Sequence, residues 1–453
     1  MKTITQSLLY IFLATLFFSS GEVKADERVR FNMDEVTRSG SIVRHYKDEM
    51  TVACYHHSSP FFMMYQTGVT TTDVMYLPPM DTICDFVIYQ DTVYFCGKGT
   101  ISRTSVGIVG YFPVADLLTS TSSNVAYVVM PSMDMVKAIK VGWFAERKHV
   151  VGVGESIKPE GKMVDMIDES TYWNVNFGDV GGDTISLSDL EITQNKVVVT
   201  SMSNNNVFAK GRLWYFSKPT VAGASLFPCY VFFTDQGTPS LGKRYGIQHI
   251  YGDNFVTVYR QGLTVGGVNR FVLSYYNAPT YFGSTVIEEP AGSVFQVGDI
   301  SKTDIGWIIG LLVYGTVETN AGTIPRSMVY ELPTNNSAPS TIQVHVYDGV
   351  FFESIYPKRT VYSIDYQHFS MSGYQPFGYG APYFMEFHAG YFEGNCLGKR
   401  EIDTQQRTIE HIPDSKVIGN TVTLQIPEMI PSNRKTMKVE TQCYSPTHEH
   451  EKE

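Results

Sequence analysis

The chain has 453 residues, of which 43% are hydrophobic and 18% are charged, a balance that allows a large apolar core. Its net charge is −10 at pH 7, and its basic residues come at most in adjacent pairs, so it lacks the basic patch that nucleic-acid binding requires. Aromatic residues make up 13% of the chain, which favours strands over helices.

The N-terminal residues are typical of a secretory signal peptide. Lys2 supplies a positive charge, Leu8–Phe18 is an apolar stretch too short to span a bilayer, and Val23-Lys24-Ala25 fits the small-x-small cleavage rule. We therefore expect residues 1–25 to be removed, with a cut near Ser20 or Gly21 as the alternative. The later apolar run Ile305–Tyr314 is also too short to span, so no transmembrane segment is expected in the mature chain.

The next feature in chain order is a predicted hairpin. Asp85–Gly97 holds two apolar, β-branched runs around the polar pair Gln90-Asp91, and Gly107–Phe112 adds a third run that ends in Tyr-Phe. A lone hairpin is marginal in water, which raises the question of whether the unit recurs.

The unit recurs, with an apolar run followed by a second run rich in aromatics. Beside the first hairpin, six further pairs match: 50–54 with 61–65, 149–153 with 163–167, 196–200 with 211–216, 255–259 with 271–276, 305–309 with 328–330, and 369–371 with 383–387. The second runs follow one another at a mean interval of about 54 residues. This spacing predicts seven repeats.

Small antiparallel sheets with two apolar faces cannot bury either face alone. Arranged radially, each sheet covers both faces with its neighbours, and closing the ring leaves only short edges. The sequence therefore predicts an all-β propeller at residues 26–445, most simply with seven blades. Six or eight blades stay open, because residues 132–168 are weakly patterned.

The hairpin and the GIVGYF run resemble the repeats of secreted β-propeller proteins from Gram-negative bacteria, many of which have no assigned function. The resemblance covers roughly residues 40–390 as a repeat pattern, and it implies a propeller in the periplasm, at the cell surface or outside the cell. WD40, Kelch and Asp-box signatures do not recur.

Propellers often close by pairing strands from the two chain ends. Val29–Met33 and Thr421–Ile426 are the two candidates for that closure, and Lys438–Cys443 is a further candidate strand. The polar residues 446–453 are predicted to be a disordered tail.

Six cysteines are compatible with disulfides in an exported chain. Cys84 and Cys96 flank the first hairpin and form the best local guess for a bridge, with free buried thiols as the alternative.

No sequence motif identifies a catalytic centre, a metal site or a cofactor. There is no nucleophile elbow and no CxxC pair. Loop-like acids (Asp179, Asp183, Asp235 and Asp348), the pair His56-His57, the tail residues His448 and His450, and the Gly178–Asp183 loop are weak candidates, for which solvated or structural roles are the simpler interpretation.

The best binding candidate is the stretch Gly373–Phe384, which is dense in aromatic residues, glycine and proline. Flat aromatic faces stack on sugars and anchor protein partners. The predicted ligand-binding residues are Tyr374, Phe377, Tyr379, Tyr383 and Trp173, the last in what reads as another long loop. The alternative is that these rings pack between blades.

These features favour an exported, monomeric, non-catalytic protein that binds a glycan or protein partner. Two alternatives stay open: a glycan hydrolase or lyase with carboxylates at the central mouth, and a structural envelope component. The sequence does not identify the ligand.

Overall fold

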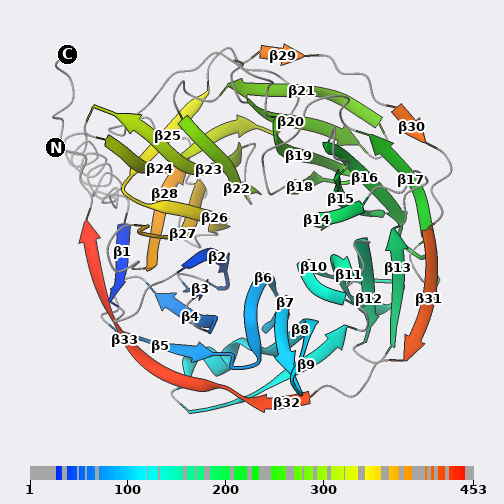
Figure 1. Cartoon of the computed structure of the whole chain (residues 1–453), viewed down its shortest axis with the longest axis horizontal. Helices are drawn as coiled ribbons and strands as arrows, with labels where there is room; N and C mark the ends of the chain where they lie inside the picture. The colour runs from blue at the N-terminus through cyan, green and yellow to red at the C-terminus, as the bar shows by residue number, and fades with distance from the viewer. Residues whose placement is uncertain are drawn as a thin grey trace, which may run out of the picture.

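Blades of antiparallel strands surround a central axis in the computed structural model (Figure 1), and the strand order divides the chain into seven of them, so it is a seven-bladed β-propeller. The structure describes residues 27–32, 38–47, 50–56, 59–66, 71–119, 121–130, 133–156, 161–168, 171–177, 184–204, 209–221, 227–233, 246–261, 270–277, 280–288, 293–303, 308–320, 322–334, 342–358, 367–376, 382–389, 403–405, 410–412, 417–423 and 428–443. In this part of the chain the single helical element is the short 3₁₀ turn η1 (Val114–Leu118).

Each blade consists of four strands that follow one another from the axis outwards, except that blade 7 takes its fourth strand from the N-terminus. Blades 1 to 3 are β2 (Arg38–His45), β3 (Met50–His56), β4 (Phe61–Gln66) and β5 (Thr71–Tyr76); β6 (Met80–Tyr89), β7 (Thr92–Ile101), β8 (Thr104–Pro113) and β9 (Asn124–Met130); and β10 (Met133–Phe144), β11 (Arg147–Ser156), β12 (Gly161–Ile167) and β13 (Thr171–Phe177). Blades 4 and 5 are β14 (Thr184–Ile192), β15 (Lys196–Asn204), β16 (Ala209–Ser217) and β17 (Phe227–Phe233), then β18 (Gly246–Tyr251), β19 (Asn254–Gln261), β20 (Arg270–Asn277) and β21 (Thr280–Glu288). Blades 6 and 7 are β22 (Ser293–Lys302), β23 (Ile308–Thr319), β24 (Gly322–Pro333) and β25 (Gln343–Asp348), then β26 (Phe351–Lys358), β27 (Gln367–Tyr374), β28 (Pro382–Ala389) and β1 (Glu27–Asn32).

The apolar runs of the sequence are the middle strands of these blades. In β4, Phe61 and Met63 pack towards blade 7, whereas Phe62 and Met64 pack towards blade 2. Successive side chains of a strand point to opposite faces, so a sheet covered on both sides needs apolar residues at every position. This is why the run reads as continuous rather than alternating.

The core is divided into seven hydrophobic clusters, one at each junction between neighbouring blades. The cluster between blades 1 and 2, for example, joins Phe62 to Phe86 with ring centroids 5.1 Å apart. The cluster between blades 7 and 1 joins Tyr65 to Phe384 at 5.0 Å. Every blade therefore buries both of its faces, as the repeat pattern predicted, and the weakly patterned region 132–168 supplies the first three strands of blade 3.

The ring closes through the N-terminal strand. β1 pairs with β28 as the outer strand of blade 7, and its residues Val29–Asn32 belong to the predicted closing segment. The second predicted closing segment, 421–426, was assigned wrongly: its described residues belong to β31 (Val417–Thr423), which pairs with β13 of blade 3. The strand that joins β1 from the C-terminal side is instead β33 (Asn433–Cys443), which contains the candidate strand Lys438–Cys443.

The C-terminal residues form a belt around the outside of the ring (Figure 1). Its five strands are β29 (Asp403–Gln405), β30 (Glu410–Ile412), β31, β32 (Glu428–Pro431) and β33, and they pair in turn with the outer strands of blades 5, 4, 3, 2 and 1. Because β33 pairs with both β5 and β1, blades 1 and 7 form one continuous nine-stranded sheet. The belt covers strand edges that would otherwise be open to pairing with other chains.

The first hairpin has the predicted strands and a two-residue turn. Gln90 and Asp91 both have positive φ, 46° and 61°, which is the backbone geometry of a type I′ turn. The predicted bridge between Cys84 and Cys96 is wrong, because both thiols are unbridged. A β-bulge between Ile83 and Asp85 takes Cys84 out of register, and Cys96 lies opposite Asp85.

Candidate functional site

The innermost strands of the ring share a repeated set of polar contacts made by aspartate side chains. Asp85, Asp189 and Asp299 each lie at a β-bulge in the first strand of blades 2, 4 and 6. One carboxylate oxygen of each accepts the N–H of the next residue, at 2.8–2.9 Å. The other accepts an N–H from the first strand of the following blade, donated by Ile139, Ile247 and Ile355 at 3.2–3.3 Å. Each of these aspartates therefore joins two neighbouring blades, and we call this contact a blade clasp.

At the junction of blades 7 and 1 the clasp is different. Val43 donates its N–H to the Ser354 hydroxyl at 3.2 Å, so a serine occupies the bulge position in β26. The neighbouring Glu353 carboxylate accepts the N–H groups of Gly40 and Ser41, at 2.5 and 2.9 Å. The first strand of blade 1 is therefore held by two consecutive residues of blade 7.

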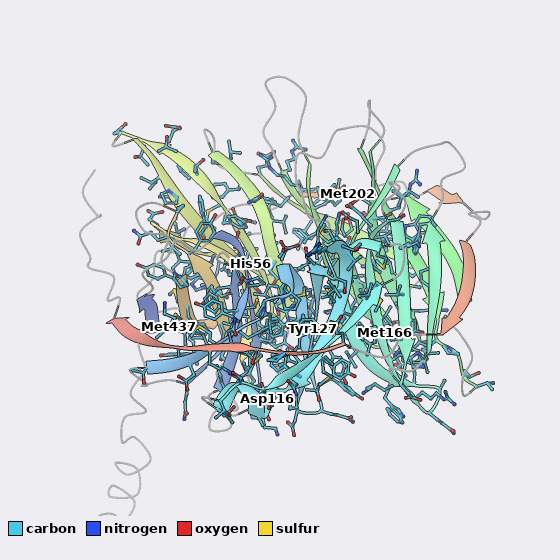
Figure 2. The ribbon with its side chains drawn as sticks, turned by 60° about the horizontal axis from the view of Figure 1, so that its bottom comes forward. His56, Asp116, Tyr127, Met166, Met202 and Met437 are labelled. Atoms are coloured by element: carbon cyan, nitrogen blue, oxygen red, sulfur yellow. The ribbon has the colours of Figure 1, made fainter. Side chains whose placement is uncertain are left out.

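The two ends of the ring differ in the residues they present. We call the end at which the second strands finish the His56 end, and the opposite end, where η1 follows the third strand β8, the Asp116 end; Figure 2 labels both residues. His56 and Tyr374 are the last residues of the second strands of their blades, so Tyr374 also lies at the His56 end. Trp143 lies beside the turn between β10 and β11, at the Asp116 end, where it is 60% exposed.

A row of three half-buried aromatic rings lies at the His56 end. Tyr314 of β23, Phe351 of β26 and Tyr374 of β27 come from blades 6 and 7. The Phe351 ring centroid lies 5.6 Å from that of Tyr314 and 5.9 Å from that of Tyr374. The row thus crosses the junction between the two blades. Gly298 makes room for it, since a Cβ there would lie 3.1 Å from a Tyr314 ring atom.

Glu353 is the carboxylate that belongs to this row. Its side chain is buried, with the residue 6% exposed, and the Tyr314 hydroxyl hydrogen-bonds to it. Burial raises the pKa of the Glu353 carboxyl above its usual range, and the hydrogen bonds from Gly40, Ser41 and Tyr314 only partly offset this. Burial also raises the pKa of Tyr374 to about 12, with a further contribution from Glu353.

Three rings and a carboxyl of raised pKa form an amphipathic surface. Aromatic rings supply flat apolar faces, and Tyr314 and Tyr374 add hydroxyl groups. A buried carboxyl with a perturbed pKa at such a surface is typical of functional sites. We call Tyr314, Phe351, Glu353 and Tyr374 the junction site.

The predicted ligand-binding residues lie in different environments. Tyr374 belongs to the junction site. Tyr383 is 4% exposed and packs in the cluster between blades 6 and 7, as the alternative interpretation held, and so it offers no face to a ligand. Phe377 and Tyr379 lie outside the described residues. Trp173 lies in the strand β13 rather than in a long loop, opposite Asp165 and Thr421 in register.

The weak chemical candidates can be placed only in part. Asp348 forms an ion pair with Arg326 at 2.6 Å, so it is a surface acid with a partner. His56 accepts the N–H of Ile83 at its Nε2, 2.9 Å away, in a structural contact between blades 1 and 2. The other candidates, namely Asp179, Asp183, Asp235, His57, His448, His450 and the Gly178–Asp183 loop, lie outside the described residues.

Two absences hold for the part of the chain that the structure describes. No group of three or more histidine, cysteine, aspartate or glutamate side chains there is placed to hold a metal ion. No helix within the same residues has the length and apolar character needed to cross a membrane.

The sequence reasoning missed Tyr314, Phe351 and Glu353. Glu353 stands in the run Val350-Phe-Phe-Glu-Ser-Ile355, where a single carboxylate interrupts apolar residues, and this was the available signal. An acid in an otherwise buried strand needs hydrogen-bond donors around it, which makes it a candidate site residue. Nothing in the sequence pointed to Tyr314, because its contact with Phe351 depends on packing between blades.

Comparison with solved structures finds the β-propeller domain of the Trilobed protease from Pyrococcus furiosus. It aligns with a TM-score of 0.42 and 8% sequence identity, covering 80% of this chain and 95% of that chain. No family model matches the sequence, and no curated protein matches it.

Proposed function

We propose that the protein is an exported, non-catalytic binding protein that holds a glycan at the junction site. The observation that carries this proposal is the row Tyr314–Phe351–Tyr374 around the buried Glu353 carboxyl. Sugar rings have apolar C–H faces that stack on aromatic rings, and hydroxyl groups that bond to carboxyl and phenol oxygens. The junction site presents both kinds of partner within one row.

The hydrolase alternative has less support among the described residues. Glycoside hydrolysis uses two carboxyl groups about 5–10 Å apart that flank the scissile bond. The inner carboxylates Asp85, Asp189 and Asp299 each hold two backbone N–H groups, which fixes them as blade clasps. Glu353 likewise accepts two backbone N–H groups and is hydrogen-bonded to Tyr314, and the four residues of the junction site include no second carboxyl group.

The signal-peptide pattern supports this role. Residues 1–25 would direct the mature chain to the periplasm, the cell surface or the medium. A monomeric propeller there would display the junction site at one end of the ring.

A glycan-array screen of the purified protein tests the proposal. We expect binding to a defined group of carbohydrates, lost or weakened at least tenfold by Tyr374→Ala. Trp143→Ala is the matched control, because it removes an exposed aromatic ring at the opposite end. Unchanged binding in the Tyr374 variant, or equal losses in both variants, would exclude the junction site. Turnover of a bound glycan would favour the hydrolase instead.

A further inference from the structure

The C-terminal strand β33 completes two outer strands at once. Its first half, Asn433–Lys438, pairs antiparallel with Tyr76–Thr71 of β5, and its second half, Lys438–Cys443, pairs with Asn32–Glu27 of β1. β5 and β1 belong to blades 1 and 7, the first and last blades of the ring. The strand therefore spans the junction at which the ring closes.

Part of this junction depends on β33 for its backbone partners. The pairing of β5 with β4 covers only Val74–Tyr76, and the remaining described residues of β5, Thr71–Asp73, pair with β33. Likewise, β28 pairs with Glu27–Arg30 of β1, whereas β33 pairs with the whole strand. Unpaired backbone groups at a sheet edge attract other extended chains.

Side-chain anchors fix the register of β33 at its first half. Met437 is 3% exposed and packs in the cluster between blades 7 and 1, with Tyr65 and Phe384. Arg434 donates to the Asp116 carbonyl at 2.6 Å and to the Ser123 hydroxyl at 3.1 Å. A strand that lacked these anchors could slip along the edge, because backbone pairing alone does not specify register.

The belt strands that precede β33 each join one blade only. β29 and β30 have three residues each and β32 has four, whereas all seven residues of β31 pair with β13. Met429 in β32 is 56% exposed. Among the described belt strands, β33 is therefore the one that joins two blades and has buried side-chain anchors at their junction.

From these contacts we infer that β5 and β1 form a binding site for an extended strand, which the chain fills with its own β33 and which accepts β33 from a second copy of the chain. The identical sequence supplies the same Met437 and Arg434 anchors, so the second copy is the ligand whose chemistry fits. This is strand addition to a sheet edge, which leads to exchange of a terminal element between two copies. The inference does not depend on the proposed function.

A cut in the folded full-length chain tests this without a folding step. A protease site is inserted between β31 and β32, the purified protein is cleaved, and a fluorescent synthetic peptide of residues 428–445 is added. We expect the cleaved fragment to co-elute with the ring and then to be replaced by excess peptide in a 1:1 complex. The same peptide with Met437→Asp, which cannot enter the apolar cluster, should bind at least tenfold more weakly.

Two results would overturn the inference. Loss of the fragment immediately after cleavage would show that the edges do not hold a strand supplied separately. Retention of the fragment with no exchange, even a few degrees below the melting temperature, would show that β33 is a permanent part of the fold. Equal affinity of the wild-type and Met437→Asp peptides would refute the role of the anchors.

Discussion

Glu353 has two roles at the scale of a single residue. Its carboxylate accepts the N–H groups of Gly40 and Ser41, which begin blade 1, and it also lies beside the aromatic row that we propose as a glycan site. A ligand that bonds to Glu353 at the junction of blades 6 and 7 would therefore contact a residue that also joins blade 7 to blade 1.

The raised pKa of Glu353 predicts a pH dependence of stability. Because the pKa of Glu353 is higher in the folded state than in the unfolded state, the native state binds the proton more tightly. The stabilisation from this bound proton is present at low pH and is lost as pH rises through the folded-state pKa. Glu353→Gln keeps an acceptor for the Gly40 and Ser41 amides but does not titrate. We expect the wild type to lose stability relative to Glu353→Gln as pH rises from about 4.5 to neutrality.

Urea unfolding of both proteins at a series of pH values measures this difference. The Gln variant is the reference at each pH, so the titration of all other groups cancels. A difference that stays constant, or one that grows in favour of the wild type as pH rises, would contradict the raised pKa.

Sequence alone could not separate Tyr374 from Tyr383. Both lie in one aromatic stretch, but Tyr383 pairs with Gly373 and its ring enters the cluster between blades, whereas Tyr374 pairs with Pro382 and stays half exposed. Which of two neighbouring rings is buried depends on the register of β27 and β28, and a one-residue shift reverses the faces. Only the structure fixes that register.

At the scale of the strand, a close contact between the first and second strands recurs in several blades, and the sequence pattern did not reveal it. Where the first strand of a blade bulges, its backbone carbonyl approaches the second strand so closely that only glycine fits there. A Cβ at Gly97 would lie 1.9 Å from the Thr82 carbonyl oxygen. Gly154 and Gly373 hold the same position in blades 3 and 7, where a Cβ would lie 2.0 Å from the carbonyl oxygens of Met135 and Phe351.

This close approach predicts that Gly97→Ala is strongly destabilising. The added methyl group cannot be accommodated without moving the backbone of β6, so we expect a loss of about 3 kcal/mol in the free energy of unfolding. Gly142→Ala is the control, because a Cβ there meets only side-chain atoms of Ile192 and Phe144, the nearest of them 3.3 Å away. Chemical denaturation of both variants measures the difference, and similar small losses would show that the bulge yields easily.

Apart from β6 in the first hairpin, the blade strands that the sequence revealed between residues 38 and 389 are second and third strands. Runs such as Phe61–Tyr65 and Lys196–Thr200 are buried on both faces and so read as continuous apolar segments. First strands such as β14 contain charged residues that clasp the next blade, which masks the pattern. Strand β31 was predicted, but its partner was not, since nothing local in an edge strand specifies which distant blade it joins.

At the scale of the whole molecule, Arg44 connects three blades around the closing junction. Its guanidinium donates to the Asp85 carboxylate at 2.6 Å and to the Phe86 carbonyl at 2.9 Å, both in blade 2. Its central carbon also lies 5.1 Å from the ring centroid of Tyr356 in blade 7. A buried arginine in blade 1 thus bonds to blade 2 and packs on blade 7.

Arg44→Ala is expected to lower the free energy of unfolding by about 3 kcal/mol, because it leaves a buried carboxylate without its cationic partner. Lys47→Ala serves as the control: it removes an ion pair with Asp91 in which both side chains are more than half exposed, and such pairs contribute little. Urea unfolding at neutral pH compares the two. If the Arg44 variant were as stable as the Lys47 variant, the closing junction would not depend on this contact.

The seven-bladed ring followed from the sequence because each blade repeats the same apolar runs, whereas the junction site did not, because it arises only from packing between blades 6 and 7. The structure of the protein in complex with a glycan from the array is the most direct test of its role. We predict that an intact sugar stacks on the row Tyr314–Phe351–Tyr374 with a hydroxyl group bonded to Glu353. A sugar bound at the Asp116 end near Trp143, or one found cleaved between two carboxylates, would contradict the account.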